Sequence, residues 1–222
     1  MKKTFHIIAA LLCLAPVVYL LAIYSHLPER VPTRFDLNGT PTVYQTRDFF
    51  AMLVSGLAVF SGLLYLFIYN AWRIDPKKKA FENRERLHKI AFSVVAFMAI
   101  IQAFLIYSSQ TGRFQKDPKL IFVLTGIFFA VIGNYMRNLK PNYFAGFRLP
   151  WTLESEDNWR KTHHLASKLW FAGGLLMALF TAILPFTPAM IAFFTIAFVI
   201  AVIPIIYSYR LFKATKRSAH GL

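Results

Sequence analysis

Six stretches of the chain are almost purely apolar, and they restrict what it can fold into. They cover residues 4–24, 49–69, 90–107, 120–136, 169–184 and 189–207. A helix rises about 1.5 Å per residue, so about 20 apolar residues cross a hydrocarbon layer about 30 Å thick. Buried strands are typically only about 4–8 residues long, so helices explain these runs better. Residues 1–222 are therefore predicted to form a single all-α membrane domain of six transmembrane helices, of which the fourth and fifth need flanking residues to complete the crossing.

The composition excludes several other classes of protein. Hydrophobic residues make up 57% of the chain and charged residues 16%, against about 45–50% and about 25% in soluble domains. An aromatic content of 17% excludes disorder, and Cys13, as the single cysteine, excludes a disulfide scaffold. The net charge is +15, but the basic residues cluster between apolar runs, so no direct nucleic-acid binding is predicted.

The distribution of Lys and Arg predicts the orientation of the spans. With the N-terminus inside, 19 of the 25 basic residues lie on the cytoplasmic side and 6 outside, as the positive-inside rule requires. Both termini and the segment 138–168 are therefore predicted to be cytoplasmic, and the segment 26–47 extracellular. The first apolar run continues to Tyr24, which is longer than a signal-peptide core, so it is interpreted as an uncleaved helix.

The predicted spans carry no ionised residue in their interior. Ion-coupled transporters usually keep such groups there, so a transporter is not favoured. Gln102 is expected to form a hydrogen bond between helices. The chain has no zinc-binding His-Glu-x-x-His pair, no nucleophile elbow and no phosphate loop. His163 and His164 are adjacent, so they cannot chelate one metal as an i,i+4 pair can. No metal and no cofactor are predicted.

Proline and glycine residues inside the spans indicate how the helices pack. Pro16 and Pro204 are expected to kink their helices and to free the carbonyls of Leu12 and Ile200. Small residues that permit close helix approach recur in the fourth and fifth spans, at Gly126, Gly133, Gly173 and Gly174.

The extracellular segment has the period of a strand. Val31 and Phe35 alternate with polar positions, and Asn38-Gly39 is a strong turn signal. We predict a short extended strand or hairpin over the outer helix ends, which Pro28 and Pro32 limit to an edge. Such a segment can contact a ligand or serve as an ordered cap, and its pattern does not choose between the two.

The cytoplasmic segment has two halves. In the first, Pro141, Gly146 and Pro150 break regular structure, and the surrounding aromatic residues suit a segment folded against the inner headgroups. In the second, Ser155 is a plausible N-cap for an interfacial helix that runs into the fifth span. Two i,i+4 ion pairs are expected to support this helix, namely Glu156–Arg160 and Asp157–Lys161. A well-built interfacial helix is sufficient to explain the pattern physically.

Two motifs resemble those of SdpI-type membrane proteins. The first consists of Leu27-Pro28, Pro32, Phe35, Gly39 and Tyr44 after a first span. The second is longer and more specific, with Asn142-Tyr-Phe-Ala-Gly146-Phe-Arg148-Leu-Pro150-Trp151-Thr152, followed by Trp159, Thr162 and His163. A His commonly precedes the Phe of the outer motif, and here that position is Arg34. A fixed cation replaces a titratable imidazole, so this position does not indicate pH sensing or metal binding.

The resemblance implies an immunity or resistance protein of a bacterial plasma membrane. Such a protein protects its host from a membrane-active peptide toxin, and it can also signal by holding a transcriptional repressor at the membrane. The extracellular residues implied in binding the peptide are Pro28, Pro32, Arg34, Phe35, Asn38 and Gly39. The cytoplasmic residues implied in setting the signalling conformation are Asn142, Gly146, Arg148, Pro150, Trp151, Trp159, Arg160, Thr162 and His163.

One alternative from a different class stays open. An intramembrane enzyme or small-molecule permease would use the Arg148–His163 region. Arg148 would clamp an anionic group and His163 would act as a base. No activated nucleophile or orienting acid accompanies them, so binding without catalysis is favoured.

Overall fold

The computed structural model describes residues 2–36, 40–77, 80–111 and 118–219 of the chain. The long helices are α1 (Lys2–Ile23), α2 (Arg47–Ile74), α3 (Arg84–Thr111), α5 (Leu120–Met136), α7 (Glu156–Ile183) and α8 (Phe186–Ala219). The shorter elements are η1 (Tyr24–His26), β1 (Arg30–Phe35), β2 (Pro41–Thr46), η2 (Ala80–Asn83) and α6 (Pro150–Glu154).

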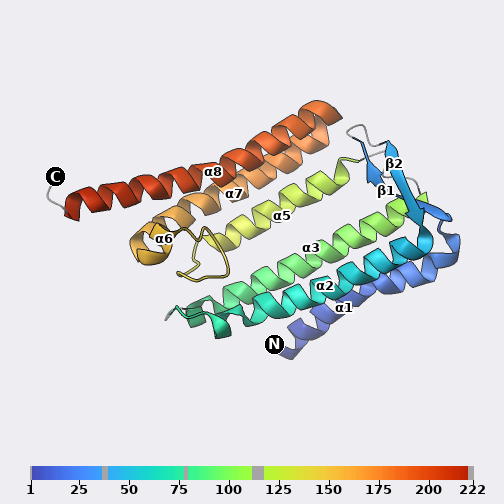
Figure 1. Ribbon diagram of the computed structural model, residues 1–222, viewed down its shortest axis with the longest axis horizontal. Helices are drawn as coiled ribbons and strands as arrows, with labels where there is room; N and C mark the ends of the chain where they lie inside the picture. The colour runs from blue at the N-terminus through green and yellow to red at the C-terminus, as the bar shows by residue number, and fades with distance from the viewer. Residues whose placement is uncertain (1, 37–39, 78–79, 112–117, 220–222) are drawn as a thin grey trace.

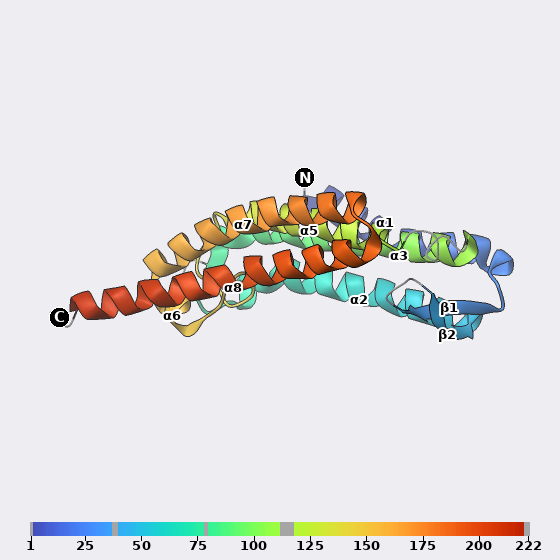
Figure 2. The same ribbon diagram turned by 90° about the horizontal axis from the view of Figure 1, so that it is seen from above.

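The six long helices lie side by side in two groups of three (Figures 1 and 2). Helices α1, α2 and α3 enclose one apolar cluster, which includes Tyr65, Tyr69 and Val95. Helices α7 and α8 pack around Met177, Phe193 and Ile200, with aromatic residues of α5 against them. The two groups meet through α3 and α5, where Ile90 and Met136 belong to one cluster.

The two ends of the bundle differ. The strands β1 and β2 lie at one end, which we call the hairpin end, and α6 with its preceding loop lies at the other, the loop end (Figure 1). Both chain termini also lie toward the loop end in this view. Each of the six long helices runs between the two ends (Figure 1).

The outer surface of the bundle is that of a membrane protein. Five helices are long and apolar enough to span a bilayer, and only 17–33% of their most apolar stretches is buried inside the protein. Large exposed side chains such as Leu63, Phe194 and Phe198 cover this surface, and lipid is the solvent that such a surface suits. The predicted fourth span coincides with α5, but at 17 residues this helix is shorter than the other five.

The glycines of the fourth and fifth spans allow α5 and α7 to approach closely, as predicted. A Cβ atom on Gly126 would lie 2.7 Å from the backbone nitrogen of Ala178. One on Gly133 would lie 2.6 Å from the nitrogen of Phe171. Any larger side chain would separate these helices, so close packing of the two backbones depends on glycine.

Two predictions about polar groups inside the spans are confirmed. The carbonyl of Ile200, which Pro204 leaves without its helical donor, accepts a hydrogen bond from Trp170 Nε1 at 3.1 Å. Gln102 on α3 donates from Nε2 to Ser61 Oγ on α2 at 3.4 Å. These bonds satisfy polar groups that lipid could not.

One helix boundary agrees with the prediction and one does not. The helix predicted after Ser155 continues through the fifth span as the single helix α7 from Glu156, as expected, and Ser155 caps it by accepting from Asn158 N at 3.2 Å. The prediction that Pro150 interrupts regular structure was wrong. Pro150 is the first residue of α6, where proline is tolerated because the first N–H of a helix has no partner within it.

Candidate functional site

The segment between α5 and α6 is a loop whose backbone is hydrogen bonded mainly to side chains. We call this set of side-chain bonds the loop lock. Asn142 is 1% exposed, and its Oδ1 accepts from the backbone nitrogens of Phe144 and Ala145 at 2.9 and 2.7 Å. Its Nδ2 donates to the carbonyl of Lys140 at 2.9 Å. One amide group thus fixes a tight turn.

Side chains from the first helical group hold the same loop from outside. Asn83 at the end of η2 is fully buried. Its Oδ1 accepts from Lys140 N at 2.8 Å, and its Nδ2 donates to Lys140 O at 3.0 Å. Asp75, after α2, accepts from Tyr143 N through Oδ2 at 2.8 Å. The loop therefore connects the two groups of helices at the loop end.

Two aromatic residues of α7 form the floor of the loop. Trp159 Nε1 donates to the carbonyl of Leu139 at 2.7 Å, and its ring stacks on that of His163 with centroids 4.0 Å apart. Phe147 N donates to His163 Nε2 at 3.0 Å, and His163 Nδ1 lies 2.9 Å from the carbonyl of Trp159. Because Nε2 accepts, the proton of the neutral imidazole is on Nδ1. Both ring nitrogens are therefore occupied within the protein.

Gly146 is required by this arrangement for two reasons. Its φ is +103°, a backbone conformation that favours glycine. A Cβ at this position would also collide with Nε2 of His163. The glycine of the motif allows the loop backbone to lie directly against the imidazole.

Helix α6 closes the loop. Thr152, which is fully buried, accepts through Oγ1 from Leu149 N at 2.9 Å and donates to the carbonyl of Phe147 at 2.7 Å. The first of these bonds gives an acceptor to the N–H of Leu149, just before the helix, as one half of a capping box does. Pro150 then starts the single turn.

Polar side chains join α6, α7 and α8 at the loop end. Trp151 Nε1 donates to Ser208 Oγ at 3.0 Å. Asn158 Nδ2 donates to Ser208 O at 2.9 Å, and Thr162 Oγ1 donates to Asn158 Oδ1 at 3.0 Å. Asn158, Thr162 and Ser208 are all buried. The Trp151 ring packs against Tyr209 and Phe212 of α8.

The two cations of the predicted cytoplasmic set are exposed. Arg148 donates from Nη1 to the carbonyl of Tyr143 at 2.7 Å, at the surface of the loop. Asp157 pairs with Lys161 at 2.6 Å, as predicted, whereas Arg160, for which Glu156 was the predicted partner, pairs with Asp157 at 2.8 Å. The other seven predicted residues make the side-chain bonds of the loop lock or of its link to α8, allow the close approach of the loop (Gly146) or begin α6 (Pro150). Structural roles therefore account for most of this motif.

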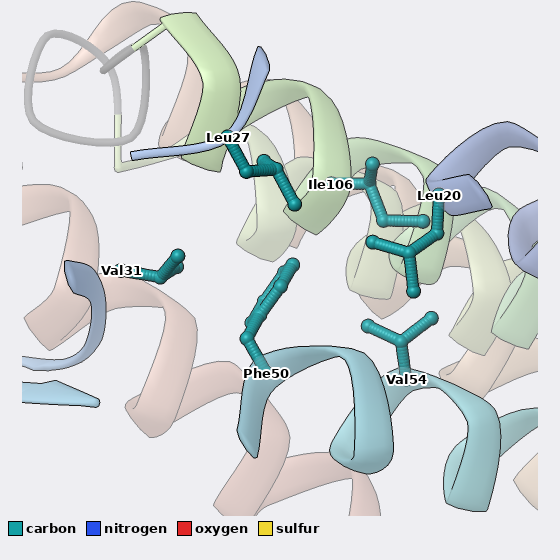
Figure 3. Close-up of a cluster of buried hydrophobic side chains, with 6 residues drawn as sticks. All are labelled: Leu20, Leu27, Val31, Phe50, Val54 and Ile106. Atoms are coloured by element: carbon teal, nitrogen blue, oxygen red, sulfur yellow. The ribbon is translucent and has the colours of Figure 1, made fainter. Parts of the chain in front are cut away.

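The predicted outer hairpin is present. Strands β1 and β2 are antiparallel, with Pro32 opposite Tyr44 and register shifts on either side of Arg34. Val31 is fully buried and belongs to a cluster with Leu20, Leu27, Phe50, Val54 and Ile106 (Figure 3). One apolar side chain thus attaches the hairpin to the ends of α1, α2 and α3.

Polar groups close the two ends of the hairpin. Asp36 N donates to Thr40 O at 2.9 Å, and Thr40 N donates to Asp36 Oδ1 at 2.7 Å. At the base, the Tyr24 hydroxyl donates to Asp48, and the guanidinium of Arg47 lies 5.2 Å from the centre of the Tyr24 ring. These contacts join the end of α1 to the start of α2.

The predicted extracellular residues differ in accessibility. Pro28 and Arg34 are exposed, and Pro32 is half-buried within β1. Phe35 is the last residue of β1, and Asn38 and Gly39 lie outside the described residues. The structure adds Tyr44, which is 48% exposed and lies opposite Pro32. Arg30 is exposed as well. The two arginines of β1 and the ring of Tyr44 are therefore available at the surface.

Sequence reasoning missed several residues that hold the loop. They are Asp75, Asn83, Asn158 and Ser208. Ser208 is a small polar residue on an otherwise apolar helix face, and that signal was available in the sequence. Asp75 and Asn83 lie in the α2–α3 connection, and no local pattern pairs them with a loop more than 50 residues away.

The lock bears on the alternative of an enzyme or permease. Among the residues that the structure describes, no group of three His, Cys, Asp or Glu side chains is placed to hold a metal ion. The lone pair of His163 Nε2 already accepts from Phe147 N, so this imidazole can take up a substrate proton only if the lock breaks. The geometry therefore disfavours a catalytic base at His163.

Comparisons with known proteins match two regions of the chain to family models. Residues 138–208 match the model of the SdpI/YfhL protein family, and this range contains the loop before α6, then α6, α7 and much of α8. Residues 11–59 match a domain of unknown function (DUF1648), which covers most of α1, the hairpin and the first part of α2. The chain is a helical membrane protein, and its resemblance to SdpI-type proteins is confirmed.

One relative matches almost from end to end. The chain is 24% identical over 221 residues to a protein named Immunity protein SdpI from Bacillus subtilis (strain 168). The match covers 99% of this chain and 96% of that protein. No solved structure matches the chain.

Proposed function

We propose that the chain is an immunity protein that protects a bacterial plasma membrane from a membrane-active peptide toxin. The observation that carries the proposal is the match to Immunity protein SdpI, which extends over 99% of the chain and includes both the hairpin and the loop lock. A relationship confined to the apolar helices would have been weaker support, because many membrane proteins share such helices.

In the proposed topology all six long helices cross the membrane, with both termini and the loop end in the cytoplasm. The 19 to 6 division of basic residues supports this orientation. Helix α5 has 17 residues and is about 26 Å long, which is less than the hydrocarbon thickness of about 30 Å. Lys119, just before it, donates to the carbonyl of Leu184 at 3.0 Å, which suits a position at the outer interface.

The hairpin is proposed to meet the toxin. Arg34 and Pro28 are exposed at this end, and Tyr44 adds an aromatic ring. Arg34 can bind carboxylate groups or aromatic faces of a peptide. The proposed contact set is the predicted one, namely Pro28, Pro32, Arg34, Phe35, Asn38 and Gly39. The hairpin would stop the peptide before it reaches the lipid.

The loop end is proposed to hold a transcriptional repressor at the membrane once the toxin is bound. The loop lock supports this role because it joins both groups of helices at one place, through Asn83 on one side and His163 on the other. A shift of one group against the other would alter the loop surface around Arg148. No catalytic step is needed for this function.

A toxin challenge tests the proposal. A toxin-sensitive strain that produces the chain is exposed to a series of peptide toxins, and survival is compared with that of a strain lacking it. Arg34→Gln should lower protection about tenfold or more, since charge-assisted contacts in a binding surface are worth about 1.5–3 kcal/mol. Arg217→Gln makes the same change at an exposed residue near the C-terminus and should leave protection unchanged.

Two outcomes would contradict the proposal. Unchanged killing by every peptide, although the chain is present in the membrane, would remove the immunity function. Equal loss of protection by Arg34→Gln and Arg217→Gln would leave immunity in place but remove the hairpin as the contact site.

A further inference from the structure

A cationic cleft opens beside α7 at the loop end, on a different side from the loop lock. Its volume is about 590 Å³. Most of its lining comes from the first turns of α7, and the remainder from the residues after α5 and from α8. The residues that matter for its chemistry are Arg137, Arg160, Lys161, His164, Lys168 and Tyr207.

The cleft has more positive charge than its ion pairs neutralise. Asp157 pairs with both Arg160 and Lys161, so one carboxylate serves two cations. Arg137 and Lys168 make no ion pair with any residue that the structure describes. A cleft that brings four cations together is complementary to an anion with several acceptor oxygens, and guanidinium groups suit phosphate in particular.

The surface beside the cleft is apolar and exposed. Phe171 and Leu175 follow Lys168 by three and seven residues, so they lie on the same face of α7, and each is 47% exposed. Ile203, four residues before Tyr207 on α8, is 39% exposed. An apolar path therefore leads from the cleft toward the middle of the helices. A soluble anion would not contact this apolar path, whereas the acyl chains of a lipid would pack along it.

We propose that this cleft binds the phosphate of an anionic phospholipid, with the acyl chains along Phe171, Leu175 and Ile203. The position suits such a ligand, because the cations lie at the end of the apolar stretch of α7, where headgroups are located. The site does not depend on the immunity function. Lipid bound there would hold the start of α7 against α5 and α8.

Native mass spectrometry of the detergent-purified protein tests the proposal. Phosphatidylglycerol and phosphatidylcholine are added at equal concentration, and we expect about fivefold higher occupancy by the anionic lipid. The double variant Arg137→Gln/Lys168→Gln should bring both lipids to the same occupancy. Its matched control, Lys213→Gln/Arg217→Gln, removes two exposed cations of α8 outside the cleft and should retain the preference.

The variant Asp157→Asn tests the proposal in the opposite direction, because it should increase lipid occupancy. Freed from this carboxylate, Arg160 and Lys161 should raise occupancy by phosphatidylglycerol about twofold. Equal occupancy by the two lipids in the unmodified protein would overturn the proposal, as would an equal loss in the cleft variant and its control. Displacement of the lipid by millimolar inorganic phosphate would also overturn it, in favour of a soluble anion. Far-UV circular dichroism of each variant confirms that its helices are intact.

Discussion

The loop end and the hairpin end are built in different ways. At the loop end, buried side chains of η2, α6, α7 and the loop itself donate to or accept from the loop backbone, as Asn83, Thr152, His163 and Asn142 do. At the hairpin end, the strands pair with each other, and among the side chains that the structure describes on them only that of Val31 is buried against the helices. The first end is held by many directional bonds to the loop backbone, and the second by strand pairing, one buried apolar side chain and a few polar contacts at its base.

This difference separates residues that maintain structure from residues that are free to bind. A buried polar group that loses its partner is costly, so the motif at the loop end tolerates little change. Exposed hairpin residues such as Arg34 have few structural duties and remain available to a ligand. A long, specific motif is therefore not by itself a recognition surface. In this chain most of the longer motif maintains a fold.

The largest effect is expected from Gly146→Ala in the lock. The substitution places a Cβ on a positive-φ residue and against the His163 ring, so the free energy of unfolding should fall by about 3 kcal/mol or more. Thermal unfolding in detergent, followed by tryptophan fluorescence, measures it. Gly56→Ala is the control, because a Cβ there meets nothing within 4 Å and should be neutral or slightly stabilising in a helix. Equal effects would refute the role given to Gly146.

Trp159→Phe should have the next largest effect. The smaller ring can still stack on His163, but the carbonyl of Leu139 loses its donor, at a cost of about 1–3 kcal/mol in the same unfolding measurement. Trp72→Phe is the matched control, because Trp72 Nε1 is buried without a hydrogen-bond partner among the described residues. If the two variants unfold alike, the indole bond contributes nothing to the lock.

Val31→Ala should act on the hairpin alone. Loss of two methyl groups from a fully buried position costs about 1–2 kcal/mol, and the hairpin has no second buried anchor of its own on β1 among the described side chains. Hydrogen exchange should therefore accelerate in peptides covering 30–46 and remain unchanged in those covering 138–168. Thr42→Ala, at an exposed position of β2, is the control. Faster exchange at the loop end would mean that the two ends are coupled.

The smallest structural effect is expected from Arg34→Gln. The side chain is exposed, so the melting temperature should stay within about 2 °C of the unmodified protein, as is usual for surface changes. Arg148→Gln makes the same change at the loop end but removes a bond to Tyr143 O, so it should lower the melting temperature more. The reverse order would show that the hairpin end depends on its cation for stability.

Local sequence patterns were sufficient to predict a large part of the fold. Uninterrupted apolar runs predicted the helices, alternation around Val31 predicted the hairpin, and Pro204 predicted the free carbonyl that Trp170 occupies. These features can be predicted from the sequence because their causes are local along the chain. Lipid requires long apolar helices, and proline removes a hydrogen bond at a known distance along the chain. The two motifs could also be recognised in the sequence, and they led to the family resemblance that the comparisons confirm.

The roles of the motif residues depended on contacts between distant segments. Asn83 and Lys140 are 57 residues apart, as are Trp151 and Ser208, and Asp75 and Tyr143 are 68 apart. Spacing along the chain cannot reveal which side chain meets which backbone group over such separations. Whether His163 is a base or a buried acceptor was therefore decided by packing, because only the folded loop brings Phe147 N to its Nε2. Hydrogen bonds are short and directional, so this choice requires the assembled tertiary structure.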